Sequence, residues 1–337
     1  MQSRCISISE FGNVNVVTIS EREVPEPRGS EVRIRVEAAS VSFTDIMIRN
    51  GLYPEVKKAP VVLGYDVVGE VEAVGPDVTR FSPGDRVADL TITGSQSEYL
   101  LRDEAGLVPV PSELEPAQAV VCVLAYLTAY QMMFRVAELK EGDSFLIHGG
   151  GGSVGSAALD LARAFGISAY ATASQSKHEF VSSFGATAID YQHEDFVQVV
   201  KQAHPDGVPA VFDAIGPENF KRSYSALSPG GSLVIFGLLD MALGRQKGGM
   251  LATGLWYGLS KLKRDRRNAM FYIITRLRKQ HPDWFQEDLT ALFELLRQGR
   301  IAPVVADIVS FFDIAEAHRR IESAEIRGKI VLDPRRR

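Results

Sequence analysis

Four consecutive glycines follow an apolar run and precede a segment with helical spacing, in the stretch SFLIHGGGGSVGSAALDLARAFG (144–166). Gly150, Gly152 and Gly155 match the pattern G-x-G-x-x-G. In that pattern the first glycine makes a tight turn, the second lets a pyrophosphate approach the backbone, and the third allows close helix packing. The phosphates would lie at the start of the helix, where N–H groups and the helix dipole favour anions. The loop therefore predicts a dinucleotide site, with a glycine-rich turn that binds nothing as the alternative.

The end of the second strand indicates which dinucleotide would bind. An NAD site usually has an acid about 20 residues beyond the loop, where it binds the ribose hydroxyls. At that place this chain has Thr172, Ala173 and Ser174, and the first acid is Glu179, inside the next predicted helix. The missing acid favours NADP(H).

Polar side chains near the same strand end could bind a 2′-phosphate. Ser174, Ser176 and Lys177 follow the strand, and Tyr191 could reach the same pocket from the third strand. The alternative is structural, because Ser176 and Glu179 fit a capping box and Lys177 could be solvated.

The elements that must position this loop change in character near residue 125. Before it, short β-like runs alternate with turns, and Val32, Ile34 and Val36 lie on one face of a predicted strand. After it, strand and helix patterns alternate, which predicts an α/β fold with a parallel sheet covered on both faces. We expect strands at 144–148, 167–173, 188–191, 210–216 and 231–237.

The C-terminal part carries a different pattern. It predicts a helix over 285–299, another helix over 304–312, and a final strand at 328–334 that could return to the first domain.

Composition sets outer limits on the kind of protein. A chain of 337 residues, 45% of them hydrophobic, can bury a large core and is expected to form two domains. The net charge of −5 does not suggest nucleic acid as the main partner. Cys5 and Cys122 are the two cysteines, too few for a disulfide framework. The N-terminus lacks the apolar core of a signal peptide, and we find no uninterrupted apolar run of the roughly 18 residues that a spanning helix needs. We therefore expect a cytoplasmic protein.

Several motifs follow one another along the chain: GLYPEVKKAPVVLGYDVVGEVEAVG, GDRV, SEYLL, AYLTAYQMM, the glycine loop, ATASQSKHEFVSSFGATAIDY and GKIVL. In these motifs and their order the chain resembles the medium-chain dehydrogenase/reductase superfamily. Within it, the chain is most similar to the zinc-independent quinone oxidoreductase branch, especially the synaptic-vesicle amine transport protein homologues. The resemblance covers nearly the whole chain and is weakest between about 240 and 285.

The resemblance implies two domains around an active-site cleft. A chaperonin-10-like, β-rich catalytic domain would comprise residues 1–124 and 276–337. A Rossmann domain with a doubly wound parallel sheet would bind NADP over residues 125–275.

The same resemblance implies that this chain lacks the catalytic zinc of other members. Zinc-dependent relatives have Cys-His-Thr-Asp where this chain has Ser42-Phe43-Thr44-Asp45. They have Gly-His-Glu where this chain has Gly64-Tyr65-Asp66. The third ligand position is Leu124, which has no donor atom for a metal. The six histidines show no ligand-like spacing, and we expect most of them to be surface or capping residues.

Without zinc, the resemblance implies transfer of hydride from NADPH to a quinone or an α,β-unsaturated carbonyl. Tyr53 matches a family tyrosine at the substrate cleft, and Thr128 matches a threonine beside the nicotinamide. Quinone reductases of this type often have Asn where Ser42 stands. We expect the hydroxyls of Ser42 and Tyr53 to donate hydrogen bonds to a substrate carbonyl. Alternatively, Tyr53 only packs against a turn, and Thr128 is an ordinary residue in the interior of a helix.

The expected cofactor contacts come from the glycine loop, the two following strand ends and the family motifs. They are Gly150, Gly151, Gly152, Ser153, Val154, Gly155, Thr172, Ser174, Lys177, Tyr191, Phe236, Gly237 and Lys329.

The resemblance also implies a homodimer in which the last Rossmann strands pair edge to edge. We expect the apolar run at 231–239 to be that edge.

A second class of function stays open: a catalytically weak nucleotide-binding protein of the vesicle amine transport type, associated with a membrane or a partner. Residues 255–279 mix aromatic and basic side chains and could touch anionic lipid. A solvated basic helix is the alternative.

Overall fold

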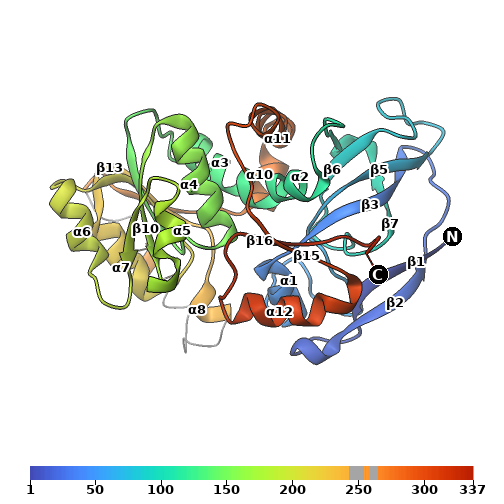
Figure 1. Ribbon diagram of the computed structural model, residues 1–337, viewed down its shortest axis with the longest axis horizontal. Coiled ribbons are helices and arrows are strands. Elements are labelled where there is room, and N and C mark those ends of the chain that lie inside the picture. The colour runs from blue at the N-terminus through green and yellow to red at the C-terminus, as the bar shows by residue number, and fades with distance from the viewer. Residues whose placement is uncertain (243–253, 255, 259–264, 337) are drawn as a thin grey trace. The chain divides into compact units, whose positions relative to one another are not determined.

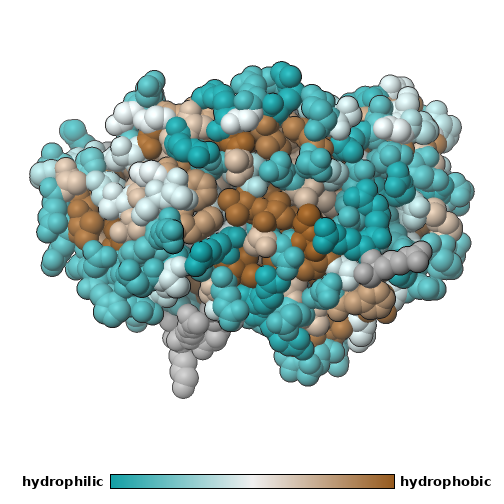
Figure 2. All heavy atoms as spheres, in the orientation of Figure 1, coloured by the Kyte–Doolittle hydropathy of each residue, from teal (hydrophilic) through white to brown (hydrophobic). Residues whose placement is uncertain are grey.

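The computed structural model describes residues 1–242, 254, 256–258 and 265–336. The chain divides into two compact units (Figure 1). Unit 1 comprises Met1–Leu127 and Gln286–Arg337, and unit 2 comprises Thr128–Phe285. The boundaries expected from the resemblance, 124/125 and 275/276, lie on the N-terminal side of these. On the face shown in Figure 2, hydrophilic side chains alternate with smaller hydrophobic patches.

Unit 1 is built on β-sheets, as the turn-rich pattern predicts. One sheet has the order β15-β16-β3-β5-β6-β8, with β7 also paired to β3, and a smaller sheet has the order β2-β1-β4. The strands of the larger sheet are β3 (Glu31–Val41), β5 (Asp66–Val74), β6 (Arg86–Leu90), β7 (Tyr99–Asp103), β8 (Val108–Pro109), β15 (Val305–Val309) and β16 (Lys329–Leu332). Those of the smaller sheet are β1 (Gln2–Ile8), β2 (Val17–Glu23) and β4 (Val61–Val62).

The core of unit 1 follows the alternation seen in the sequence. Val32, Ile34 and Val36 of β3 are each at most 1% exposed and pack against Val67 and Val71 of β5. The predicted strand and the face it buries are therefore confirmed.

The C-terminal segment confirms one prediction and contradicts another. β16 pairs antiparallel with β3, so the final strand returns to the first unit. The helix predicted over 304–312 is wrong, because β15 and the short 3-10 turn η6 (Phe311–Asp313) occupy this stretch. An apolar run of this length does not separate strand from helix by periodicity alone. Parallel pairing with β16 provides its backbone partners.

Helices complete unit 1. They are α1 (Phe43–Arg49), α2 (Pro116–Val121), α11 (Pro282–Arg297), which begins just before the boundary, and α12 (Ile314–Glu322). α12 runs beside α1 (Figure 1).

Unit 2 contains a six-stranded parallel sheet in the order β11-β10-β9-β12-β13-β14. The chain order runs outward in both directions from β9, so the switch point lies between β9 and β12. All five strands predicted here are confirmed. The strands are β9 (Ser144–His148), β10 (Ser168–Ala173), β11 (Thr187–Asp190), β12 (Val208–Asp213), β13 (Leu227–Ile235) and β14 (Asn268–Phe271). The helices of unit 2 include α4 (Ser153–Phe165), α5 (His178–Ser182), α6 (Phe196–Ala203), α7 (Pro217–Ser225), α8 (Leu239–Ala242) and α10 (Ile274–Gln280).

The last strand of this sheet corrects two expectations. β13 contains the first five residues of the apolar run at 231–239, and it pairs with β14 from Ser232 to Ile235, so it is not the sheet edge. Residues 255–279 were considered as one basic helix, but their described part contains β14 followed by α10. Residues 255 and 259–264 of that segment lie outside the described residues.

One helical segment crosses the boundary between the units. Pro116–Val136 is long enough and, with a mean hydropathy of 1.5, apolar enough to span a membrane by these two measures. The segment is not an uninterrupted apolar run, because it contains polar residues such as Thr128 and Gln131. In this structure 72% of its most apolar window is buried, as in the core helix of a folded domain.

Candidate functional site

The glycine loop joins β9 to α4, as predicted, and the surroundings of each glycine in the pattern fit its expected role. A Cβ added at Gly150 would lie 2.7 Å from the Cβ of Ala171, and one at Gly155 would lie 2.2 Å from the carbonyl oxygen of Gly149. A Cβ at Gly152 would meet nothing closer than that same oxygen, at 3.4 Å. The first and third glycines therefore allow close packing, and the second leaves room for a ligand.

The helix behind the loop presents its N-terminus there. α4 begins at Ser153, and its N-cap Gly152 has no side chain that could compete with a ligand for the helix N–H groups. It ends at Gly166, whose φ of 67° is left-handed, as the sequence predicts. The first N–H groups of an α-helix have no acceptor within the helix, so this end suits an anion. Ser153, Val154 and Gly155 form its first turn, and their contact with a cofactor stays a prediction.

Thr172 lies beneath the loop. It is 3% exposed, and its carbonyl oxygen accepts hydrogen bonds from the N–H groups of Gly149 at 3.1 Å and Gly150 at 2.9 Å. In this structure it therefore supports the loop backbone, and a direct contact with a cofactor stays a prediction.

The structure brings Lys177 to the glycine loop. A Cβ added at Gly151 would lie 2.5 Å from Cδ of Lys177, so this lysine crosses the loop at a residue that has no side chain. The proposed capping box of Ser176 and Glu179 is not the helix start, because the N-cap of α5 is Lys177 itself. A cationic side chain thus lies against the loop.

The ends of β10 and β11 lie side by side. Ala173 pairs with Asp190, which brings Ser174 and Tyr191 to the same edge of the sheet. Tyr191 is 57% exposed. The acid at this edge, Asp190, accepts hydrogen bonds from the backbone N–H of Gln192 at 3.0 Å and from Nδ1 of His193 at 2.7 Å. The bond from His193 is the main reason that the pKa of Asp190 lies below its ordinary value.

Phe236 and Gly237 directly follow β13 at the carboxyl edge of the sheet. The N–H of Phe236 donates to the carbonyl oxygen of Asp213 at 3.0 Å. A Cβ at Gly237 would lie 2.9 Å from the Cβ of Ala214, so this glycine allows the two loops after β12 and β13 to touch. Thr128, the first residue of unit 2, is 6% exposed within the helical segment 116–136. Their contacts with a cofactor stay predictions.

His148, at the end of β9, is the residue of this region that the sequence analysis missed. It is 5% exposed, and its two ring nitrogens lie 3.0 Å from Oγ1 of Thr172 and 2.9 Å from Oγ of Ser223. We expected most histidines to be surface or capping residues. A histidine that directly precedes the four consecutive glycines was the available signal.

Ser42 in unit 1 has a different role from the one expected. Its Oγ donates to Oδ2 of Asp45 at 2.8 Å, and its N–H donates to the same oxygen at 2.8 Å. The two residues form the capping box that begins α1. A hydroxyl has one proton, so donation to a substrate carbonyl would first require this bond to break.

Lys329 was assigned to the cofactor, but its side chain lies in the interior of unit 1. It is 3% exposed, and its charge acts on the carboxyl groups of Asp66 and Asp45, which are both 0% exposed. Burial raises the pKa of Asp45 to about 6 and also raises that of Asp66, whereas it lowers the pKa of Lys329. We call these three residues the buried charge cluster. A role of Lys329 towards a cofactor stays a prediction.

Tyr53 is paired with Tyr65, a residue that the sequence analysis considered only as the replacement of a zinc ligand. The hydroxyl oxygens of Tyr53 and Tyr65 lie 2.5 Å apart, and the rings meet edge to face with centroids 5.7 Å apart. Tyr65 is 2% exposed, and Tyr53 is half-buried. The buried phenol can therefore orient the more exposed one.

The residues at the places of the zinc ligands do not fit a zinc ion. Ser42 bonds Asp45, Tyr65 bonds Tyr53, and Leu124 has no donor atom. Within the described ranges, no group of three His, Cys, Asp or Glu side chains lies close enough together to hold a metal.

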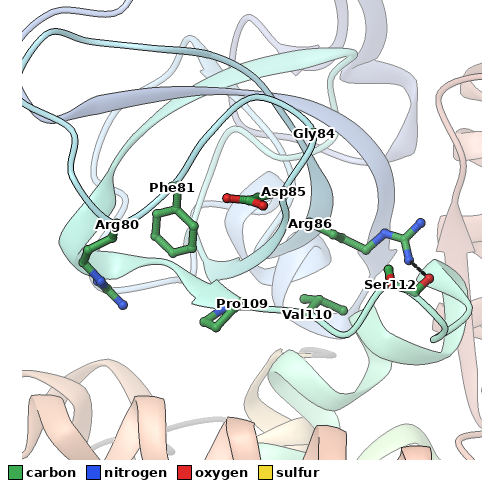
Figure 3. A pocket seen from close by; sticks show the side chains of 8 residues that line it. All are labelled: Arg80, Phe81, Gly84, Asp85, Arg86, Pro109, Val110 and Ser112. Atoms are coloured by element: carbon green, nitrogen blue, oxygen red, sulfur yellow. Dashed lines mark hydrogen bonds between the residues drawn. The ribbon is translucent and has the colours of Figure 1, made fainter.

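A hollow of about 550 Å³ on unit 1 is lined by Arg80, Phe81, Gly84, Asp85, Arg86, Pro109, Val110 and Ser112 (Figure 3). Arg86 crosses one end and donates to the carbonyl oxygen of Ser112 at 2.8 Å. None of the residues predicted to bind cofactor or substrate lines it, and we assign it no function.

Comparison with known proteins gives matches along the chain. The model of the alcohol dehydrogenase GroES-like domain matches residues 28–112, and the model described as zinc-binding dehydrogenase matches residues 184–332. The synaptic vesicle membrane protein VAT-1 homolog of Rattus norvegicus is 31% identical over 98% of this chain and 84% of its own. A quinone oxidoreductase of Pseudomonas aeruginosa is 31% identical over 98% of this chain and 99% of its own. A solved mycobacterial protein complexed with NADPH has a TM-score of 0.84 and 26% identity, and the match covers 98% of this chain and 100% of that one.

Proposed function

Because the chain is an oxidoreductase of the medium-chain dehydrogenase/reductase superfamily and belongs to its quinone oxidoreductase branch, we propose that it is a zinc-independent, NADPH-dependent reductase. Its acceptor is a quinone or an α,β-unsaturated carbonyl compound. The observation that carries the proposal is the loop at the end of β9, where Gly152 leaves open space at the start of α4. This is the place where dinucleotides bind in doubly wound sheets.

The preference for NADPH over NADH rests on the neighbouring strand end. β10 ends without an acid that could bind the ribose hydroxyls, and Lys177 lies against the loop with Ser174 and Tyr191 at the same sheet edge. A 2′-phosphate is an acceptor that lysine and hydroxyl groups bind well.

The chain's own residues supply positioning and hydrogen bonds. NADPH, when bound, supplies the hydride. A quinone that accepts a hydride and a proton becomes a hydroquinone, and an enone that accepts both becomes a saturated ketone. In either case negative charge develops on an oxygen, and the phenol of Tyr53, oriented by Tyr65, can donate a hydrogen bond to it. The hydroxyl of Ser42 would take part only after release from Asp45.

Titration with the two dinucleotides tests the cofactor assignment. The intrinsic fluorescence of the wild-type protein should report tighter binding of NADPH than of NADH. Lys177→Ala should weaken NADPH by about tenfold, the size of one charge-assisted hydrogen bond, and leave NADH nearly unchanged. Lys201→Ala, which removes an exposed lysine of α6, is the matched control. An equal loss of both dinucleotides in Lys177→Ala would contradict this assignment of the phosphate pocket.

A panel of quinones and enones, followed by NADPH depletion, tests the reaction itself. Turnover with at least one class supports the reductase. NADPH binding without any turnover, together with sedimentation of the protein with anionic liposomes, would favour the catalytically weak, membrane-associated alternative.

We propose that the protein is a homodimer. The support is β14, which ends the order of the described strands in this sheet, with Phe271 39% exposed and the nearby Ile273 47% exposed, because an apolar strand at a sheet edge favours pairing. Light scattering that gives the mass of a monomer would contradict this.

A further inference from the structure

A chain of hydrogen bonds runs beneath the glycine loop, entirely within unit 2. Asp213, at the end of β12, is 0% exposed and accepts the proton of Ser223 Oγ at 2.6 Å. The oxygen of Ser223 lies 2.9 Å from Nε2 of His148, and Nδ1 of His148 lies 3.0 Å from Oγ1 of Thr172. The backbone N–H of Gly149 points to that same Oγ1 at 3.4 Å. These bonds link α7, β9, β10 and the loop.

The protons in this chain have one consistent direction. Ser223 donates its only proton to the carboxylate of Asp213, so its oxygen accepts from Nε2–H of His148. Burial holds the pKa of His148 below its ordinary value, which keeps the ring neutral and leaves Nδ1 as an acceptor. Thr172 therefore donates its hydroxyl proton to Nδ1, and its oxygen stays available as an acceptor for Gly149.

The same threonine holds the loop through its backbone. Its carbonyl oxygen accepts from the N–H groups of Gly149 and Gly150. Both the hydroxyl and the carbonyl of Thr172 thus face the start of the loop, and His148 determines the orientation of the hydroxyl. Asp213 is fully engaged, because it also accepts from the N–H of Ile215 at 2.8 Å and from Nδ2 of Asn219 at 2.9 Å.

We infer that His148 is a positioning residue for the dinucleotide: it ties the end of β10 to α7 through Thr172 and Ser223, and so holds the loop in the conformation that opens Gly152 to a pyrophosphate. The inference rests on the proposed function. His148 acts through Thr172 and does not touch the reacting atoms. It supports the part of the site that NADPH and NADH share, whereas Lys177 is assigned to the part in which they differ.

A purely structural role would give a different result. The ring of His148 also packs edge to face on Phe196, with centroids 4.7 Å apart, so a core role alone would lower stability without changing cofactor affinity. Positioning predicts a rise in the cofactor Kd and KM, a kcat at saturating cofactor that changes by less than about twofold, and coupling between His148 and Thr172.

The test combines two single variants with their double variant. His148→Phe keeps a ring without nitrogens, and Thr172→Val keeps the backbone carbonyl and the branched shape without the hydroxyl. Each should raise the Kd of both NADPH and NADH by about tenfold, the size of one lost hydrogen bond. The double variant should bind no more weakly than the weaker single variant, because both changes break the same link.

Two further variants keep the proposal testable if His148→Phe does not fold. His148→Asn places an amide oxygen where Thr172 can still donate but does not reach Ser223, so it should raise the Kd of both dinucleotides less than Thr172→Val does. Ser223→Ala leaves Nε2–H of His148 without its acceptor and should weaken both dinucleotides equally. His204→Phe, at the end of α6 and outside this chain of bonds, is the matched control and should change neither.

The outcomes separate the inference from the function on which it rests. Unchanged dinucleotide affinity in His148→Phe, additive losses in the double variant, or a loss confined to NADPH would each overturn the positioning role. Failure of the wild-type protein to bind either dinucleotide would overturn the proposed function, and the inference with it.

Discussion

The buried charge cluster of unit 1 and the buried carboxylate of Asp213 in unit 2 have different kinds of partners. Unit 1 encloses the buried charge cluster, in which the ammonium of Lys329 acts on the carboxylates of Asp45 and Asp66. In unit 2, the buried carboxylate of Asp213 accepts hydrogen bonds from uncharged donors, and the chain of bonds continues through Ser223 and His148 to the glycine loop. The buried charge cluster thus contains an opposite charge in addition to hydrogen bonds from Ser40 and Ser42, whereas the hydrogen-bond donors to Asp213 among the described residues are uncharged groups.

The difference indicates which kind of change each unit tolerates. A cluster of opposite charges depends on all its members, since removing one leaves the others buried without an opposite charge. A chain of neutral hydrogen bonds can lose a member at a lower cost in stability, but it loses the geometry that the chain maintains. Variants in unit 1 should therefore affect folding most, and variants under the loop should affect binding most.

Lys329→Met should produce the largest effect. It leaves Asp45 and Asp66 buried without the ammonium that lowers their pKa, so the free energy of unfolding should fall by about 3 to 5 kcal/mol at pH 8. Denaturant titration measures it. Arg319→Gln, which breaks the exposed pair with Glu316, should change the value by less than about 0.5 kcal/mol.

The pH dependence of this loss has a definite sign. The folded pKa of Asp45, about 6, is raised above its ordinary 3.8, so the folded state binds more protons in that window and stability through this group falls as pH rises from about 4 to 6. Removal of Lys329 raises both carboxyl pKa values further. The defect should therefore be smaller at pH 5 than at pH 8, and a defect that grows towards pH 5 would contradict the assignment of charges.

Two alanine substitutions in the loop should separate packing from binding. In Gly155→Ala the new Cβ would lie 2.2 Å from the oxygen of Gly149, so stability should fall by about 1 to 3 kcal/mol. In Gly152→Ala the new Cβ has room in the free protein, and the φ of −83° suits alanine, so stability should change little while NADPH binding is lost. Thermal unfolding and fluorescence titration measure the two quantities. Equal stability losses would mean that Gly152 also serves packing.

The tyrosine pair should give the smallest effect. Tyr53→Phe should lower turnover of the accepted quinone or enone by about tenfold at saturating NADPH, because water can partly replace the lost donor. Tyr65→Phe should lower it less, since Tyr65 acts only through Tyr53. Steady-state kinetics measure both, with the KM for NADPH as the control. Unchanged turnover in Tyr53→Phe would make this tyrosine a packing residue.

Much of unit 2 could be predicted from the chain itself. The strand 144–148, the glycine spacing and the helix end at Gly166 are local signals that depend on neighbouring residues. The stretch 304–312 was assigned wrongly because its conformation depends on β16, which lies some twenty residues further along. The pairing of β14 with β13 was not predicted, because no local sequence pattern shows which two strands pair.

The candidate site shows the same division between local and long-range information. The sequence by itself determined the superfamily, the parallel sheet, the glycine loop and the missing acid after β10, because these depend on residue types at short, regular spacings. Only the tertiary structure decided that Ser42 caps a helix, that the charge of Lys329 acts on two buried aspartates, that Tyr65 orients Tyr53, and that His148 supports the loop. Each of those roles depends on distances between side chains that only the folded chain sets.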